Sequence, residues 1–389
     1  MERFPDRFQV IAHPWQEFIV RASLLFSAST AQPTPVGSSR LWIMSLWGVL
    51  LALMPFDASA QESAGQSTSQ NQSPPEKLTV MTWNVEWFYD EHDGDNFSKL
   101  AKEKTAPTRG DWDWHRDAVA RSISRAKPSI LALQEVENRR VLWYLSRALD
   151  RDYKLDYTEL CDESTDHFTE QDVGLMFRSP VEVLQTSHFR MTSAMKSTEQ
   201  YYDLSKHILA VFQVPNGTDQ PEHVTVMNVH LRSRAEGESI RVRQARLIHH
   251  WIKERVIAGE NVILLGDTNT EESGDTTRLG SDLGVVSGLE TETPEDDLID
   301  LHLRLSPQDR RTHLLAGKEF DRIFVSRSLL EDDPDRPDLV FTSIKVLKEL
   351  SIQGEADSEA EHWEQYWKRA ENQRDISDHY PVQATFEIR

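Results

Sequence analysis

Residues 223–231 read HVTVMNVHL, and this short stretch contains the pattern that decides the fold. Alternate residues of a β-strand project to the same face. Val224 and Val226 therefore begin one face of the predicted strand, and they suit an apolar core. Asn228 and His230 follow on that face, where a core would not place them. The pattern predicts a strand that starts in a core and ends at a polar site.

The same change from apolar to polar occurs at the ends of other predicted strands. Val80 and Thr82 lead into Asn84. Comparable ends are Glu135 after Leu131 and Leu133, and Asp267 and Asn269 after Val262 and Leu264. Leaving one such group buried without a partner costs about 1–3 kcal/mol. We therefore expect these side chains to pair with one another or with a bound ion.

Each of these residues also has an ordinary structural interpretation. Asn84 could form a turn at the end of a strand, and Glu135 could cap a following helix. His230 could be a hydrogen-bonded core histidine. Residues 266–269, GDTN, could be a simple turn, and Asp321 could belong to an ion pair. These interpretations lose force together, because a β-sandwich has no need of a polar residue at so many strand ends.

The pair Asp378-His379 presents the same choice near the C-terminus. It precedes the last predicted strand within residues 374–388, which read RDISDHYPVQATFEI. An acid beside an imidazole at a strand entrance is compatible with turn chemistry. It is equally compatible with half of an active site.

Short runs rich in Val, Ile, Phe and Thr alternate with a few helical segments after Leu78. Helical spacing is found at residues 115–126 and 243–260, and a surface helix is expected at residues 361–372. The predicted strands are residues 78–88, 129–136, 172–179, 208–214, 223–231, 261–267, 320–326, 339–347 and 380–388. Many strands with few helices predict an α/β sandwich, in which two packed sheets carry helices outside.

The composition limits the choice of partners. An apolar fraction of 38% suffices for a core, and the formal net charge is -21. Because non-specific binding to a phosphate backbone requires a surplus of Lys and Arg, a phosphate substrate here needs a local basic cleft or a metal. The single cysteine, Cys161, excludes an intrachain disulfide and disfavours a zinc–thiolate site.

The N-terminal part has the composition of a targeting segment. Arg40, an apolar run over residues 41–56 and Ala58-Ser59-Ala60 follow the order of a secretory signal. We therefore expect residues 1–60 to be a signal peptide with an N-terminal extension, although a membrane anchor is the alternative. Residues 61–77 are polar and predict a disordered linker. A secreted or periplasmic domain is expected over residues 78–389.

Six motifs occur in one order over this domain and together resemble the endonuclease/exonuclease/phosphatase superfamily. They are TWNVEWF (82–88), ILALQEVEN (130–138), NVHLRSR (228–234), LLGDTNT (264–270), FDRIFVS (320–326) and SDHYPV (377–382). The resemblance implies a deoxyribonuclease I-like, four-layer α/β sandwich. Its two mostly antiparallel sheets would be flanked by helices, with the site at one end of the sheets.

The resemblance also implies roles for individual residues. Asn84, Glu135 and Asp378 would form the metal site. The expected catalytic residues are His230, Asp267, Asn269, Asp321 and His379. In these roles Asp267 is a candidate base for the attacking water, Asp321 would orient His379, and His230 would stabilise the leaving oxygen. The pair Asp378-His379 is then better interpreted as catalytic than as a turn.

Oxygen ligands favour Mg²⁺ or Mn²⁺ at this site. The acidic stretches could add Ca²⁺ sites, although most such stretches are solvated loops; they are residues 110–117, 159–172, 269–284 and 329–338.

Substrate contacts are expected from Arg232 and Asn228. Arg234, Lys206 and His207 could add to a local positive field. Trp87, near the expected site, could stack on a base or sugar, whereas Trp83 is expected in the core.

The favoured function is a metal-dependent nuclease that hydrolyses DNA or RNA by attack of water on phosphate. A sphingomyelinase-type or inositol-phosphate-type phosphoesterase is the alternative, supported by the acidic composition. A third possibility is an inactive binding domain on the same fold, which is disfavoured because every motif position is filled. We expect a monomer without a stable protein partner.

Overall fold

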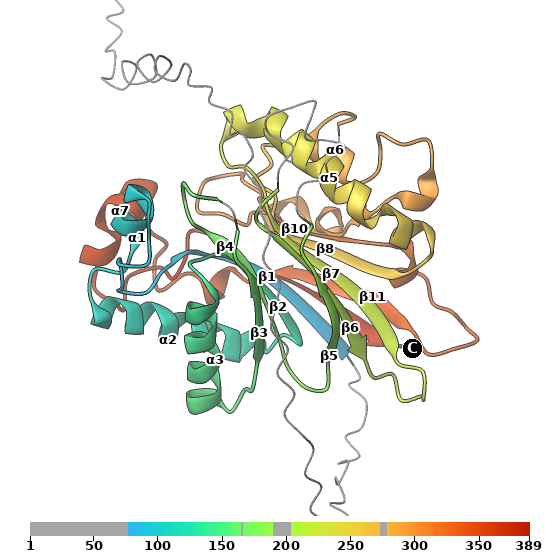
Figure 1. The fold of residues 1–389 in the computed structure, drawn as a ribbon, viewed down its shortest axis with the longest axis horizontal. Helices are drawn as coiled ribbons and strands as arrows, with labels where there is room; N and C mark the ends of the chain where they lie inside the picture. The colour runs from blue at the N-terminus through green and yellow to red at the C-terminus, as the bar shows by residue number, and fades with distance from the viewer. Residues whose placement is uncertain (1–76, 165, 190–203, 273–277) are drawn as a thin grey trace, which may run out of the picture. The chain divides into compact units, whose positions relative to one another are not determined.

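The computed structural model describes residues 77–164, 166–189, 204–272 and 278–389. The strands of this part of the chain form two six-stranded sheets (Figure 1). In order, the first sheet consists of β11 (Leu339–Val346), β12 (Val382–Ile388), β1 (Lys77–Phe88), β2 (Ile130–Val136), β4 (Asp172–Phe177) and β3 (Thr158–Asp162). The second consists of β5 (Glu182–Ser187), β6 (His207–Val214), β7 (Glu222–His230), β8 (Asn261–Asp267), β10 (Asp321–Val325) and β9 (Ile299–Asp300).

Each sheet is mixed, with one parallel pair among antiparallel neighbours. The parallel pairs are β1–β2 in the first sheet and β7–β8 in the second. The remaining neighbours are antiparallel. The prediction of two mostly antiparallel sheets is therefore confirmed.

Helices cover the outer face of each sheet, which completes four layers (Figure 1). α2 (Arg109–Ala126) and α3 (Arg139–Tyr153) pack on the first sheet through one apolar cluster. α5 (Glu238–Ile257) packs on the second sheet through another. Shorter helices are α1 (Lys99–Lys104), α6 (Asp282–Val286) and α7 (Glu359–Gln365).

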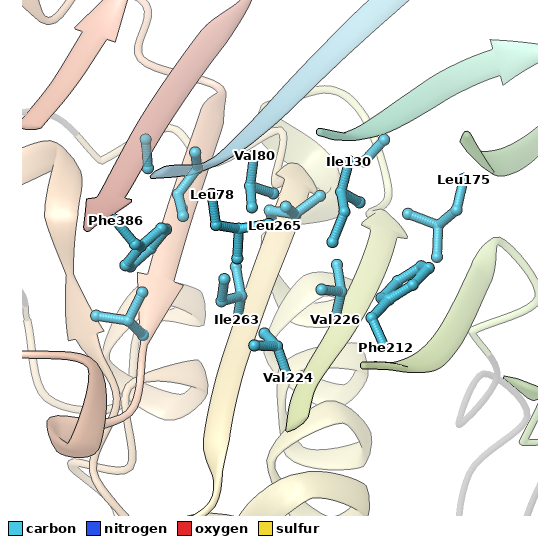
Figure 2. Close-up of a cluster of buried hydrophobic side chains, with 14 of the residues drawn as sticks. Leu78, Val80, Ile130, Leu175, Phe212, Val224, Val226, Ile263, Leu265 and Phe386 are labelled. Carbon is cyan, nitrogen blue, oxygen red and sulfur yellow. The ribbon is translucent and has the colours of Figure 1, made fainter. Parts of the chain in front are cut away.

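The main core lies between the two sheets (Figure 2). Val80 and Ile130 reach into it from the first sheet, and Val226 and Ile263 reach into it from the second. All four side chains are fully buried. This core ends where the inward-facing rows of residues become polar, so the fold itself directs those polar groups toward one another.

The strand periodicity was predicted correctly for β7 and wrongly for β8. Val224 and Val226 face the inter-sheet core, as expected. In β8 the inward residues that precede Asp267 are Ile263 and Leu265. Val262 and Leu264 instead face α5. Alternate residues of a strand share a face, so the face that ends in Asp267 contains Ile263 and Leu265.

Several element assignments differ from the prediction. α3, β3, β5 and β9 were not predicted, and the acidic residues 110–117 lie inside α2 rather than in a loop. β1 begins at Lys77, one residue before the expected domain start. The predicted signal peptide (residues 1–60) and nearly all of the predicted linker lie outside the described residues. Among the described helices, none has the length and apolar character that crossing a bilayer requires.

Candidate active site

The amide of Asn84, at the inward end of β1, joins the two sheets at the polar end of the core. Its Nδ2 donates to Glu135 Oε1 of the first sheet at 3.1 Å and to Asp267 Oδ2 of the second at 3.0 Å. His379 Nε2 lies 3.4 Å from the same nitrogen. Asn84 is fully buried, so one amide holds together the ends of strands that are distant in sequence.

Glu135 reaches this cluster through an irregularity in β2. Leu131 and Leu133 face the outer helices, so regular alternation would also direct Glu135 outward. Instead, the strand register shifts between Gln134 and Val136. Glu135 itself has φ 61°, in the left-handed region. A bulge of this kind redirects a side chain, and here it accompanies the turn of the carboxylate toward the site.

Burial, together with the negative charge of Asp378, raises the pKa of Glu135 to about 7. The hydrogen bonds from Asn84 and from the Trp87 backbone N–H, at 3.0 Å, act in the opposite direction. A buried carboxylate with a second acid nearby favours either a proton or a cation.

Asp267 lies at the centre of the cluster. Its Oδ2 accepts hydrogen bonds from Asn84 and Asn269, the latter at 3.0 Å, and its Oδ1 accepts from the Asn269 backbone at 2.9 Å. His230 Nε2 lies 3.4 Å from Oδ2 and His379 Nε2 lies 3.8 Å from it. Burial alone would raise the pKa of Asp267, but the charge of His379, together with the hydrogen bonds from Asn84 and the Asn269 backbone, lowers it.

His379 is held by a carboxylate behind it. Its Nδ1 donates to Asp321 Oδ2 at 2.8 Å, and both side chains are buried. Burial acts to lower the pKa of His379, but Asp321 and Asp267 outweigh it and raise the pKa well above its ordinary value. The imidazole is therefore charged at neutral pH, with Nε2 facing the cluster.

His230 has the opposite electrostatic character. Burial, aided by Lys206, lowers its pKa to about 3, so the imidazole is neutral. Within the described residues, its buried Nδ1 has no hydrogen-bond partner. One ligand atom each from Glu135, His230 and Asp267 lies within 4.8 Å of the others. A partly buried acid, a buried acid and a neutral imidazole with this spacing fit a divalent cation.

Asp378, the third predicted metal ligand, lies beside the cluster: its charge acts on Glu135, and its Oδ1 lies 3.9 Å from His379 Nε2. Asp378 Oδ2 accepts from Trp363 Nε1 at 3.1 Å and lies 3.4 Å from His313 Nε2. Its possible metal-ligand groups combine it with His313 and His379, or with Glu86 and His362. Metal-ligand spacing places Glu135 with His230 and Asp267. The assignment of Asn84 and Asp378 as metal ligands stays a prediction.

The assignment of Asn228 to substrate binding is also corrected. Asn228 is fully buried, and its Nδ2 donates to the backbone carbonyls of Leu133 and Gly174 in the opposite sheet. Gln134 donates to its Oδ1 at 2.6 Å. These bonds use both amide hydrogens. Asn228 therefore joins the two sheets, two residues before His230 on the same face of β7.

Two features of the site were not predicted. His313 accepts from the Leu315 N–H at Nδ1, which leaves its Nε2 proton facing Asp378. Glu86 Oε2 accepts from the Asp378 N–H at 3.1 Å. The same oxygen lies 2.6 Å from Nε2 of His362, a residue of α7. His313 had no strand motif around it. Glu86, inside the first motif, was the available signal.

A cavity of about 340 Å³ opens at the cluster. Glu135, His230, Asp267, Asn269 and His379 all line it. The basic residues at the cavity are Lys206, Arg232 and Arg234, and its apolar residues include Trp87, Leu100 and Phe168. The structure therefore brings Arg232 to the site, as expected.

His207 lies elsewhere. Its ring is buried and stacks between His188, at 4.3 Å, and Trp251, at 4.8 Å. It therefore adds nothing to the positive field at the cavity. In the described part of the chain, no His/acid group of metal-ligand spacing includes a residue of the four acidic stretches.

Comparisons with known proteins agree with this geometry. The model of the Endonuclease/Exonuclease/phosphatase family matches residues 81–379. Humanized D. rerio TDP2 with 14 mutations has 19% sequence identity and a TM-score of 0.51, with 80% of this chain and 100% of that chain covered. D. rerio TDP2 complexed with single strand DNA product has 19% identity, a TM-score of 0.50 and the same coverage.

The human Nocturnin catalytic domain with bound sulfate has 16% identity and a TM-score of 0.50, with 81% of this chain and 95% of that chain covered. At these identities the likeness shows the fold alone. No curated protein matches the sequence.

Proposed function

The chain belongs to the endonuclease/exonuclease/phosphatase family, and from that premise we propose that it is a divalent-metal-dependent phosphodiesterase that hydrolyses nucleic acid. Enzymes of this family are hydrolytic phosphoesterases that typically use divalent metals. The observation that carries the proposal is the convergence of Glu135, His230, Asp267 and His379 on one cavity, with the buried Asn84 amide joining Glu135 to Asp267. Such a set of acids, amide and imidazoles suits hydrolysis at phosphorus better than a packing role.

Asp267 is proposed as the base that accepts a proton from the attacking water. Its lowered pKa keeps it ionised, and both carboxylate oxygens are held by hydrogen bonds. The Asn269 amide, which donates to Asp267 Oδ2, would hold the water or a phosphate oxygen beside it. A base that is fixed within hydrogen-bond reach of its proton contributes about 10²–10⁴-fold to a rate.

The two histidines are proposed to bind different oxygens of the phosphate. Charged His379, oriented by Asp321, would donate from Nε2 to a non-bridging oxygen. Neutral His230 would stabilise the leaving oxygen by a hydrogen bond. This division follows from the opposite pKa shifts of the two rings, because only the ring backed by a carboxylate retains its charge.

Glu135 and one oxygen of Asp267 are proposed to hold the cation. Mg²⁺ or Mn²⁺ suits these two carboxylates. A bound divalent cation would neutralise the phosphate and polarise one of its oxygens. The raised pKa of Glu135 supports the assignment, because a positive charge beside it would reverse the cost of its burial.

Nucleic acid is the favoured substrate because positive charge is gathered locally on an acidic protein. Arg232 and Arg234 line the cavity with exposed side chains. In the described part of the chain, neither guanidinium forms an ion pair with an acid. D. rerio TDP2, which shares the fold, has been solved with a single strand DNA product, which makes nucleic acid the first substrate to test.

Export is proposed from the sequence of residues 40–61. Cleavage after Ala60 would release a protein that begins at Gln61 and is secreted or periplasmic. Cell fractionation and N-terminal sequencing test this: a full-length protein that stays in the cytoplasm would contradict it.

Incubation of the purified protein with four substrates tests the activity. Plasmid DNA, RNA, sphingomyelin and inositol phosphates are each supplied with Mg²⁺ or EDTA, and the His379→Ala variant is the control. Cleavage of nucleic acid that EDTA and His379→Ala both abolish is the expected result. Release of choline phosphate or inorganic phosphate instead would assign a lipid or inositol substrate. An absence of product, with equal binding by the wild type and the variant, would indicate an inactive binding domain.

A further inference from the structure

We propose that Trp87, Leu100 and Phe168 form a wall that stacks on a nucleobase beside the scissile phosphate. The enzyme would therefore act on single-stranded or locally unpaired nucleic acid. This inference rests on the nuclease function proposed above and specifies its substrate class. We call these three residues the aromatic wall, since two of them carry aromatic rings. All three line the same cavity as Glu135 and His230.

The aromatic wall presents apolar surface to solvent at the place where the substrate must enter. Phe168 is 66% exposed although it is a large apolar side chain. The Trp87 ring packs edge-on against Tyr89, with ring centroids 5.5 Å apart, and Lys104 Nζ lies 5.3 Å from the centre of the Trp87 ring. The indole is therefore fixed in place beside the cavity. Exposed aromatic surface at a polar cavity is an indication of ligand contact.

The loop that carries Phe168 is braced on both sides. Asp166 Oδ1 accepts from the Phe168 N–H at 2.9 Å. Lys206 Nζ lies 2.9 Å from Asp166 Oδ2 and donates to Thr169 Oγ1 at 2.8 Å. Tyr89 Oη donates to the Thr169 carbonyl at 2.7 Å. These contacts hold the backbone on either side of the phenyl ring, which lowers the entropy that binding would otherwise cost.

The same loop is joined to the segment that carries Leu100. The Glu170 carboxylate accepts from the backbone N–H groups of Phe97 and Ser98, where α1 begins. Leu100 lies in the first turn of this helix. The three residues of the aromatic wall therefore come from segments connected by hydrogen bonds, and they form one surface rather than three separate contacts.

Positive charge for the phosphates lies at the same cavity. The backbone that carries Arg232 and Arg234 is fixed by buried Arg241, whose Nη1 donates to their carbonyls at 3.0 and 2.7 Å. Arg241 is itself paired with buried Asp282. Cationic groups for the backbone beside aromatic rings for the bases are the arrangement with which proteins bind single strands.

The geometry disfavours both a duplex and a lipid. In a duplex the base faces are covered by neighbouring bases, so the aromatic wall could stack only on an unpaired base. A cavity of about 340 Å³ is within the range of small-molecule sites, which suits one nucleotide. A lipid would require a continuous apolar edge for membrane contact, yet Phe168 stands between the polar residues His167 and Thr169.

A cycle of variants and substrates tests the stacking contact. Thymidylyl-thymidine is compared with two analogues that each lack one base, so that every substrate has one scissile bond. Loss of a base that stacks on an aromatic ring corresponds to about 5- to 150-fold, and we expect this decrease in kcat/KM for the wild type on one analogue. On the intact dinucleotide, the kcat/KM of Phe168→Ala should fall below that of the wild type by a similar factor. On that analogue, the kcat/KM of Phe168→Ala should be close to that of the wild type, because the base that stacks is already absent. Phe168→Trp should behave as the wild type.

Phe97→Ala is the matched control, because Phe97 is 87% exposed and close in the structure but does not line the cavity. It should leave kcat/KM unchanged, and both the wild type and this control should cleave a single strand faster than the same sequence as a duplex. Equal decreases for Phe168→Ala on the intact and base-free substrates would overturn the inference. So would a Phe168→Ala variant that loses release of choline phosphate from sphingomyelin vesicles but not nuclease activity.

Binding separates this inference from the proposed function. Fluorescence anisotropy with EDTA compares labelled oligothymidine with an abasic strand of the same length and charge. Tighter binding of oligothymidine, abolished by Phe168→Ala, would support the aromatic wall even if no substrate were hydrolysed. Equal binding of the two strands would overturn it even if hydrolysis were established.

Discussion

Protonated His362 should make the stability of the protein depend on pH above neutrality. This histidine of α7 is fully buried between two carboxylates: its Nε2 lies 2.6 Å from Glu86 Oε2 and its Nδ1 lies 3.5 Å from Asp357 Oδ2. Burial acts to lower the pKa of His362, but Glu86, Asp378 and Asp357 outweigh it and raise the pKa to about 9. The perturbation we propose is His362→Gln, which keeps the hydrogen bond and removes the charge.

The magnitude follows from the difference between the folded and unfolded pKa values. A rise from 6.5 to about 9 corresponds to about 3 kcal/mol of folding free energy. Because the folded pKa is the higher one, this contribution is fully present below the unfolded value of 6.5. It is lost as the pH rises through about 9. The charged form should therefore stabilise the protein at neutral pH and not in alkali.

Urea unfolding at about pH 6 and about pH 9.5 measures the effect. The free-energy difference between the wild type and His362→Gln should shrink by about 3 kcal/mol between the two conditions. His250→Gln, at an exposed position of α5, is the control and should follow the wild type at both. Parallel losses in the wild type and His362→Gln would refute the reasoning, because they would mean that His362 is not charged between Glu86 and Asp357.

Three further substitutions test the site and its support. Asp321→Asn should lower turnover by about 10²–10⁴-fold with little loss of stability. Without the Asp321 carboxylate the pKa of His379 should fall, so activity should decline at a lower pH than in the wild type. A pH–rate profile checks this. Gly266→Ala should destabilise the fold by at least about 3 kcal/mol in urea unfolding, since the new Cβ would lie 2.0 Å from the Val229 carbonyl oxygen at a φ of +141°. Mg²⁺ at a hundredfold excess over its Kd should stabilise the folded wild type by about 2.7 kcal/mol and so raise its melting temperature. Glu135→Gln should abolish this rise. An unchanged rise in the variant would mean that Glu135 does not bind the metal.

The sequence was sufficient to predict the two sheets, but not which side chains of every strand point inward. Strand periodicity identified the inward row of β7 correctly. It failed for Glu135, whose inward position depends on a bulge and a left-handed backbone that no two-residue pattern predicts. α3 was not predicted, although its start carries a helix signal: Asn138 is an N-cap residue that accepts from the Arg140 and Val141 N–H groups.

The site was predictable only where a motif carried it. Asp267 and His379 followed from strand ends and from the family resemblance, and the structure brings both to one cavity. Asn228 was misassigned because its partners, two backbone carbonyls of the opposite sheet, are 95 and 54 residues away in sequence. His313 and Phe168 were missed for a similar reason, since only the three-dimensional fold places them beside the site.

At three site residues the left-handed backbone favours glycine, whereas the proposed function requires the side chain. Glu86, Trp87 and Glu135 all have positive φ without being glycine, and each such residue costs roughly 1–2 kcal/mol. Glycine would relieve that cost, but it would remove the carboxylate or the indole. Directed evolution for heat resistance alone should therefore accumulate glycine at these positions and yield a sturdier protein without catalysis. A screen that alternates heat with turnover should leave them untouched.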